Sequence, residues 1–409
     1  MINLSNKTCK EYLIYFAPVF LLVYLVLETY QIDFRVFYVA GKSVLYNLDP
    51  YLNHVSQFPE LYVPINAHDT PTSGFLYPPF AALLFAPLGF FSYAVAKMIF
   101  SLIIIFLLII FSFHFLRKSQ FKLPGEAILF IMCSFPIFAT FERGQIDTLV
   151  MYLTFLSFDV FQNRKPNSFL TASFLLAISS CIKVFPIVTL VYYLFNKKFK
   201  YLISAILFTI LVFFLPLLYF DFSVYQHFFQ VILPNIFGEI TTSETINTHG
   251  QNVVNNLVIA VGNTGLENTG LIASRNLSNG YMNPFLKNNT LGALLIGLAA
   301  MISLLILNRK NSKEYQFYAI LNTINLFNPK AWIMGLVWYF PTFFILYPQV
   351  NKWGKLVILT PVFMPPFTNT NAMLALVITL LFSVCLNNQK FGKYLLKKEY
   401  TNQDNKTTI

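Results

Sequence analysis

The sequence predicts an all-α integral membrane protein, a polytopic helical bundle with about 12 membrane spans. Of its 409 residues, 56% are hydrophobic and only 11% are charged, whereas soluble domains average about 25% charged residues. The apolar residues run in long blocks, and the basic residues form short clusters between these blocks. Such clusters are topology signals, so we interpret the net charge of +11 as a membrane feature and expect no nucleic-acid partner.

The cysteines predict neither a metal site nor a disulfide framework. The chain has four, Cys9, Cys133, Cys181 and Cys385, and they are scattered. No cluster of histidines and carboxylates has metal-ligand spacing. We therefore expect no metal and no cofactor. The abundance of Phe, Ile, Asn and Lys is typical of an AT-rich genome and favours a bacterial origin.

The first span is expected over residues 13–28, as a retained helix that begins in the cytoplasm after Lys7 and Lys10. Residues 31–77 follow as a first outer loop. Within it, Phe34, Phe37 and Tyr38 recur at helical spacing, which predicts an amphipathic helix at the membrane interface.

Residues 77–92 are apolar but contain Pro78, Pro79, Pro87 and Gly89. Counting this segment as a span would place the next basic cluster outside, so we interpret it as re-entrant or interfacial. One span is then expected over 97–116. Further spans are expected near 125–141, 145–161, 168–182, 184–195, 200–220, 291–308, 315–327, 331–348, 354–366 and 370–386.

This arrangement is a single transmembrane domain over residues 1–390 with both termini in the cytoplasm. Residues 221–290 form a large outer loop rich in Asn, Thr and Ser, and residues 391–409 form a basic cytoplasmic tail. The segments 168–182 and 184–195 would meet at an outer tip near Lys183 and Pro186. Short, broken helices of this kind are tolerated where they line a cavity.

Asp33 is the leading catalytic candidate. It comes just after the first span, at the outer boundary of the membrane, where a carboxylate is partly shielded from water and close to lipid headgroups. Those are suitable conditions for a general base acting on a membrane-bound substrate. An ordinary polar residue at a helix end is the structural alternative.

The residues around Asp33 open a series of motifs that resembles glycosyltransferase family 87. The segment DFRVFYVAGKSVLYNLDPY has the family's acid, aromatic pair and Asp-Pro-Tyr turn, with Asn47 where Gly is usual; both residue types adopt positive φ. The series continues as FLYPPFAALLFAPL from Phe75, GQIDTLVMYL from Gly144, AISSCIKVFPIVTLVYYL from Ala177 and NPKAWIMG from Asn328. Two departures are that Ile333 to Gly335 stand where histidines are frequent, and that HGQNVVNN from His249 differs from the usual Gly-Asn-Gln-Ser.

The resemblance implies a GT-C type bundle in the cytoplasmic membrane, with its active site on the outer face. The implied reaction moves a hexose such as mannose from a polyprenyl-phosphate donor to a hydroxyl of a lipid or glycan acceptor of the cell envelope. Such a transfer needs a base for the acceptor hydroxyl and positive charge near the phosphate.

Lys183 and Arg143 are the candidate ligands of the donor phosphate. A lysine at a broken helix tip is costly in a membrane without such a task, although snorkelling to the interface is an alternative. The guanidinium of Arg143 suits phosphate, but a structural ion pair with neighbouring Glu142 or Asp147 is equally compatible with the sequence. Candidate substrate-binding residues are Tyr38, Tyr77, Gln145, Asp147, His249, Gln251 and Asn252.

Two other functions remain open from the sequence. A transporter or flippase of lipid-linked saccharide would also have many spans and buried charge, but it should show related halves. The outer loops at 31–77 and 221–290 differ from each other. An outer-face glycan polymerase would also carry a large external loop, but the acid after the first span favours the transferase.

Overall fold

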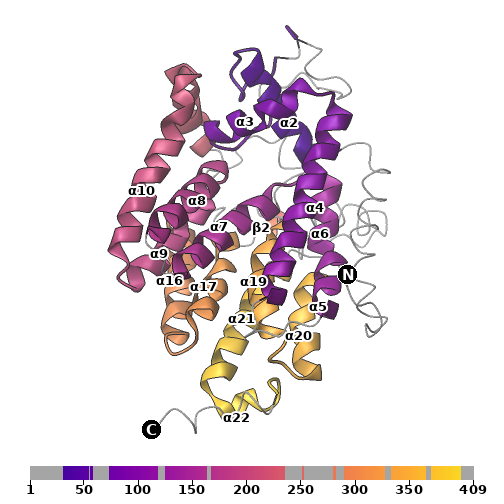
Figure 1. The fold of residues 1–409 in the computed structure, drawn as a ribbon, viewed down its shortest axis with the longest axis vertical. Helices are drawn as coiled ribbons and strands as arrows, with labels where there is room; N and C mark the ends of the chain where they lie inside the picture. Colours follow the sequence, from indigo (N-terminus) through magenta and orange to yellow (C-terminus); the bar gives the residue numbers. More distant parts are fainter. Residues whose placement is uncertain are drawn as a thin grey trace. The chain divides into compact units, whose positions relative to one another are not determined.

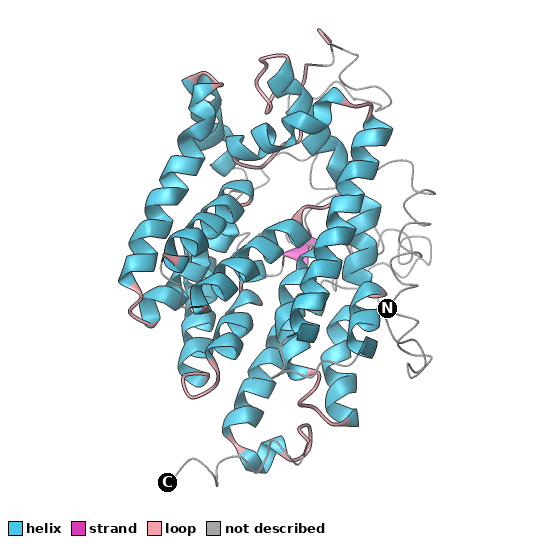
Figure 2. Cartoon of the chain, viewed as in Figure 1, coloured by secondary structure: helices cyan, strands magenta, loops and turns pink. Residues whose placement is uncertain are grey.

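The computed structural model describes residues 31–54, 56–58, 73–117, 125–163, 167–234, 251–252, 280–281, 290–327, 333–364 and 370–397. Helices dominate this part of the chain (Figure 2), which confirms the expected helical class. Two strands of two residues each, β1 (Gln251–Asn252) and β2 (Gly280–Tyr281), pair in parallel. The first expected span, 13–28, lies outside the described residues.

The chain divides into two compact units. The site unit comprises residues 21–109 and 139–238, and the C-terminal unit comprises residues 1–20, 110–138 and 239–409. Two helices, α4 (Tyr93–Arg117) and α6 (Phe135–Arg143), begin in one unit and end in the other. The single domain expected over 1–390 stays a prediction.

The site unit is a series of short helices, several of which are interrupted by 3₁₀ or π turns (Figure 1). Besides parts of α4 and α6 it contains α2 (Ile32–Leu45), α3 (Pro79–Phe85), η3 (Ala86–Phe90), α7 (Asp147–Gln162), α8 (Ser168–Ile182), η4 (Phe185–Thr189), α9 (Leu190–Phe195), α10 (Phe199–Phe214), η5 (Leu215–Leu218), α11 (Phe222–His227) and the π-helical turn η6 (Phe228–Ile232).

Helix α2 is the amphipathic helix that the sequence predicts. Phe34, Phe37 and Tyr38 are buried on one face, because apolar residues three or four positions apart lie on the same side of a helix. The helix is followed by Asn47 at φ 57°, in the left-handed region that the Asp-Pro-Tyr turn was expected to require.

Helices α7, α8 and α10 are joined by buried hydroxyl groups. Thr154 on α7 lies 2.7 Å from Ser179 on α8, and Ser157 lies 2.7 Å from the hydroxyl of Tyr201 on α10. In apolar helices such bonds fix the rotation of one helix against its neighbour, each at a gain of about 0.6 kcal/mol.

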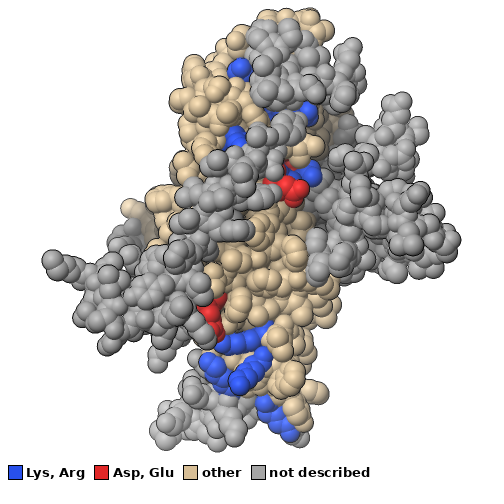
Figure 3. Space-filling view, turned by 90° about the vertical axis from the view of Figure 1, so that its right-hand side faces the viewer, with Lys and Arg blue, Asp and Glu red and all other residues tan. Residues whose placement is uncertain are grey.

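The outer face of α10 is apolar. Ile203, Leu207 and Leu211, at four-residue spacing, have exposed fractions of 58%, 61% and 61%. Water-soluble proteins rarely present such a stripe, so we interpret this face as lipid-exposed. Figure 3 shows one side of the molecule, on which charged side chains form a few small groups within a mainly uncharged described surface.

Two described helices are long and apolar enough to cross a membrane, Tyr93–Leu116 and Phe199–Leu218. The pair α5 (Gly125–Met132) and α6, bent by 43°, would make a third. The other apolar helices have 10–17 residues, short of the about 20 that a perpendicular span needs. The segment 77–92 is one of these short elements, separate from α4, and the full number of about 12 spans stays a prediction.

In the C-terminal unit, buried amides and hydroxyls again link the helices. Its elements are α5, α16 (Thr290–Leu307), α17 (Lys313–Leu321), α18 (Ile324–Phe327), η7 (Ile333–Tyr339), α19 (Phe340–Leu346), α20 (Lys352–Phe363), α21 (Thr370–Asn387) and α22 (Gln389–Gly392). The amide of Asn322 donates to the hydroxyls of Thr342 and Thr379, both at 3.0 Å.

Leu396, in the segment expected as a tail, forms an antiparallel bridge with Val350.

Candidate active site

Asp33 and Arg143 form a two-pronged ion pair. Asp33 lies in the first turn of α2, and Arg143 is the last residue of α6. Arg143 Nε donates to Asp33 Oδ2 at 2.6 Å and Nη2 donates to Oδ1 at 3.0 Å. Gln145 Nε2 adds a third bond to Oδ2 at 2.9 Å. Both charged side chains keep about a fifth of their surface exposed, 20% for Asp33 and 18% for Arg143.

Gly144 explains how the end of α6 comes so close to α2. Its φ is +72°, and a Cβ atom there would lie only 2.4 Å from the Cβ of Phe34. Only glycine fits both constraints without displacing its neighbours. The side-chain amide of Gln31 also donates to the backbone carbonyl of Phe141, which links the start of α2 to the end of α6. The Gly-Gln motif therefore places Arg143 and Gln145 against Asp33.

A second ion pair lies one turn further along the chain. Lys183 Nζ is 2.7 Å from Asp147 Oδ1. Asp147 is the first residue of α7, and Lys183 is the extended residue at which α8 ends, before the 3₁₀ turn that contains Pro186. The side chain of Asp147 is 5% exposed and that of Lys183 is 13% exposed. The break in the 168–195 helix pair falls at the lysine, as the sequence predicts, and it directs this lysine to an acid.

Tyr77 lies beside both ion pairs. Burial raises the pKa of its phenol well above the ordinary value, and the carboxylates of Asp147 and Asp33 raise it further. A hydrogen bond with Gln145 and the charge of Arg143 act in the opposite direction. The phenol therefore stays protonated and neutral at physiological pH, with its hydroxyl among two acids and an amide.

Six of the residues predicted from the sequence thus form one cluster: Asp33, Tyr77, Arg143, Gln145, Asp147 and Lys183.

Residues 75–274 match the model of glycosyltransferase family 87. The resemblance seen in the motifs is thereby confirmed, and it indicates a membrane glycosyltransferase. The matched region includes the Tyr-Pro-Pro, Gly-Gln and Lys-x-x-Pro motifs with Tyr77, Arg143, Asp147 and Lys183; Asp33 precedes it. No curated protein matches the chain.

The remaining candidates predicted from the sequence lie elsewhere or outside the described residues. Tyr38 is 1% exposed, donates its hydroxyl to the carbonyl of Phe91 at 2.8 Å and contacts the ring of Tyr93. Its role in substrate binding stays a prediction. His249 lies outside the described residues. Gln251 and Asn252 are described only through the backbone of β1.

Arg143 pairs with neither of the two acids that lie near it in the sequence. Glu142 and Asp147 lie near Arg143 in the chain, but Glu142 is exposed and Asp147 binds Lys183. Adjacent residues of a helix point in different directions, so closeness in sequence was a poor guide to pairing. Among the described residues, no group of three or more His, Cys, Asp or Glu side chains has a metal-binding arrangement.

Two residues near the cluster were not predicted as site residues, Asp49 and His227. They form an ion pair with 3.0 Å between His227 Nδ1 and Asp49 Oδ2. The Asp-Pro-Tyr motif singled out Asp49 as part of a turn, but nothing in the sequence linked it to a histidine 178 positions away.

Proposed function

We propose that this family 87 chain transfers a hexose from a polyprenyl-phosphate donor to an acceptor hydroxyl on the outer face of the cytoplasmic membrane. Mannose is the hexose that the family resemblance suggests. The single observation that supports this most directly is the meeting of the Asp33–Arg143 and Asp147–Lys183 ion pairs around Tyr77. Asp33, Asp147 and Lys183 come from motifs that resemble the family's, and Arg143 immediately precedes the Gly-Gln motif.

The charges of this cluster fit a phosphate-linked sugar. Two acids and two cations leave it without net charge, so an incoming phosphate would meet two cations, each paired with one carboxylate. Arg143 suits two phosphate oxygens at once, whereas Lys183 acts as a point charge. Each cation can turn toward the donor while its acid turns toward the sugar or the acceptor.

The transfer then needs one base and no acid. Asp33 accepts the proton of the acceptor hydroxyl, and the hydroxyl oxygen forms a bond to the anomeric carbon of the sugar. The bond from that carbon to the phosphate oxygen breaks, and its electron pair stays on the polyprenyl phosphate. This leaving group is already a stable anion, and Lys183 and Arg143 offset the extra charge that develops on it.

We assign the binding of sugar hydroxyl groups to Gln145, Asp147 and the neutral hydroxyl of Tyr77. An amide, a carboxylate and a phenol offer both donors and acceptors, as the hydroxyls of a hexose require. The lipid chain of the donor would lie against apolar faces such as that of α10. His249, Gln251 and Asn252 remain the proposed residues on the acceptor side.

Transport of a lipid-linked saccharide is the alternative function. A transporter needs no base beside its phosphate site, whereas here a carboxylate bonds directly to the arginine that would bind the phosphate. A glycan polymerase would use similar chemistry on a longer acceptor, and product length separates it from a single transfer.

The test is an assay of the purified protein with a panel of labelled polyprenyl-phosphate sugars and an endogenous lipid extract. We expect one donor to yield a labelled lipid or glycan product that carries a single added sugar. Labelled donor that crosses a sealed vesicle unchanged would instead support a transporter, and a ladder of products would support a polymerase.

A further inference from the structure

The Asp-Pro-Tyr turn is held by both oxygens of one side chain. Asp49 Oδ1 accepts the backbone N–H of Tyr51 at 2.8 Å, which closes an Asx turn. Its backbone carbonyl lies 2.8 Å from His54 Nε2. The other side-chain oxygen, Oδ2, binds His227 Nδ1 at 3.0 Å. The conformation of this turn is therefore tied to a residue from a distant part of the site unit.

His227 brings α11 onto the turn through its ring as well as its nitrogen. It is the last residue of α11, and its ring lies edge-on to the ring of Tyr51, with centroids 5.5 Å apart at 66°. The ring of the next residue, Phe228, packs against the same tyrosine, with ring centroids 6.0 Å apart. Tyr51 is fully buried, so its position depends on these neighbours.

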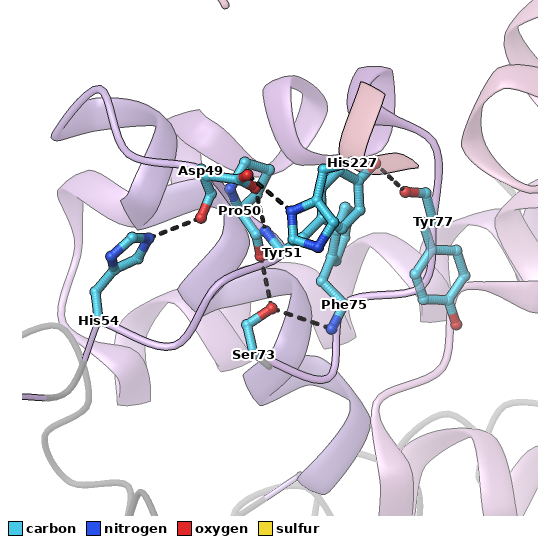
Figure 4. A network of polar contacts seen from close by, with 8 residues as sticks. All are labelled: Asp49, Pro50, Tyr51, His54, Ser73, Phe75, Tyr77 and His227. Carbon is cyan, nitrogen blue, oxygen red and sulfur yellow. Dashed lines mark hydrogen bonds and ion pairs between the residues drawn. The ribbon is translucent and has the colours of Figure 1, made fainter. Parts of the chain in front are cut away.

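Tyr51 links the Asp-Pro-Tyr turn to the backbone of Tyr77. Its hydroxyl donates to the backbone carbonyl of Tyr77 at 2.8 Å. Ser73 adds two bonds between the same segments, from its hydroxyl to the carbonyl of Pro50 at 2.6 Å and from its backbone N–H to the carbonyl of Tyr51 at 3.0 Å. In Figure 4 the backbone oxygen of Tyr77 faces this network, while its phenol ring points away from it.

The segment that carries Tyr77 has little other support from its own secondary structure. Residues 73–78 are irregular, and α3 begins only at Pro79. The position of the phenol is set by backbone hydrogen bonds to the turn and by ring contacts. One such contact is with Phe37, whose ring centroid lies 4.6 Å from that of Tyr77. The phenol in turn lies beside Asp33 and Asp147.

We propose that His227 is a positioning residue for the transfer site: through Asp49 and Tyr51 it fixes Tyr77 beside the two ion pairs. This inference rests on the proposed function. It assigns to α11, the first helix of the 221–290 segment, the task of setting the shape of the donor site. His227 touches no substrate in this scheme and acts only through the turn.

The experiment compares three variants of the full-length protein. His227→Phe keeps an aromatic ring against Tyr51 but removes the nitrogen that binds Asp49. His227→Asn loses the ring but places an amide N–H near the position of Nδ1, so it serves as the conservative rescue. Gln226→Ala changes the exposed neighbour of His227 on α11 and leaves the bonds of the turn in place, and is the matched control.

Two readouts distinguish positioning from a general loss of stability. In His227→Phe we expect faster backbone hydrogen exchange over residues 73–78, with α7 and α8 unchanged. We also expect the KM for the donor to rise about tenfold with kcat nearly unchanged, because a misplaced contact residue weakens binding before it alters the chemistry. His227→Asn should recover most of the wild-type exchange protection and of the wild-type KM, and Gln226→Ala should behave as wild type.

Unchanged exchange over 73–78 in His227→Phe would overturn the proposal, because His227 would then not fix Tyr77. Faster exchange with an unchanged KM and kcat would also overturn it, since the position of Tyr77 would not matter for the transfer. A fall in kcat at constant KM, matched by a smaller folded fraction, would mean a purely structural role. If the wild type transfers no sugar at all, the proposed function is wrong. Hydrogen exchange over residues 73–78 then decides by itself whether His227 fixes the position of Tyr77.

Discussion

Arg143 binds Asp33 through both carboxylate oxygens, with 2.6 Å from Nε to Oδ2 and 3.0 Å from Nη2 to Oδ1. The two residues come from different helices and have separate proposed tasks, the base and a phosphate ligand. Because they bind each other directly, any change at one alters the other. Variants at this site therefore need to preserve the hydrogen-bonding shape of the residue that they replace.

Asp33→Asn removes the proposed base while its amide oxygen can still accept a bond from Arg143. We expect turnover to fall by about 10²–10⁴-fold with fold and donor binding retained. The measurement is single-turnover transfer together with donor affinity, and Asp221→Asn, at an exposed acid, is the control. Lost donor affinity with intact residual chemistry would reassign Asp33 to sugar binding.

Lys183→Met should weaken donor binding as well as turnover, because the ammonium acts on donor and leaving group alike. It also leaves Asp147, only 5% exposed, without its partner, which destabilises the protein. The double variant Lys183→Met with Asp147→Asn removes both charges. We expect thermal unfolding in detergent to recover in the double variant while donor affinity stays low; recovery of both would make the pair merely structural.

Gly144→Ala should disrupt the approach of α6 to α2. The added methyl group meets Phe34 at 2.4 Å in a backbone conformation of φ +72°, at an expected cost of about 1–3 kcal/mol. Gly74→Ala is the matched control, because its φ is +81° but its nearest neighbouring atom lies 3.8 Å away. Melting temperatures of the two variants separate backbone strain from the clash. Equal losses would mean that the clash is absorbed without cost.

The topology can be tested with single cysteines and a membrane-impermeant reagent. We expect labelling from outside at Ser56→Cys and Ser243→Cys, with Ser119→Cys and Thr401→Cys protected until the membrane is opened. The reason is the predominance of basic clusters on the cytoplasmic side of the proposed arrangement. Outside labelling at position 119 would restore 77–92 as a full span and invert the sides that follow.

Chelation should leave the activity intact. The leaving phosphate has two protein cations beside it in the proposed mechanism, so no divalent ion is needed to offset its charge. Transfer measured in excess chelator should match the untreated rate. Complete loss, with recovery on adding magnesium or manganese, would make Asp33 a metal ligand rather than a free base.

Much of the local structure followed from the sequence for clear reasons. Helical spacing of Phe34, Phe37 and Tyr38 predicted the buried face of α2, and Asn47 was expected at positive φ because the turn tolerates only a few residue types there. Proline and lysine at the 182–186 break predicted the end of α8. The number of spans could not be tested in the same way, because several expected spans are short helices.

Sequence alone thus determined a helical membrane protein whose motifs resemble glycosyltransferase family 87, and the residues that carry its charge. Periodicity, hydropathy and motif order are properties of the chain. Only the tertiary structure decided which charges meet. Asp33 pairs with Arg143 across 110 positions, and Asp49 pairs with His227 across 178. The energy of an ion pair depends on distance in space and on the burial of both groups, and neither quantity is contained in the spacing along the chain.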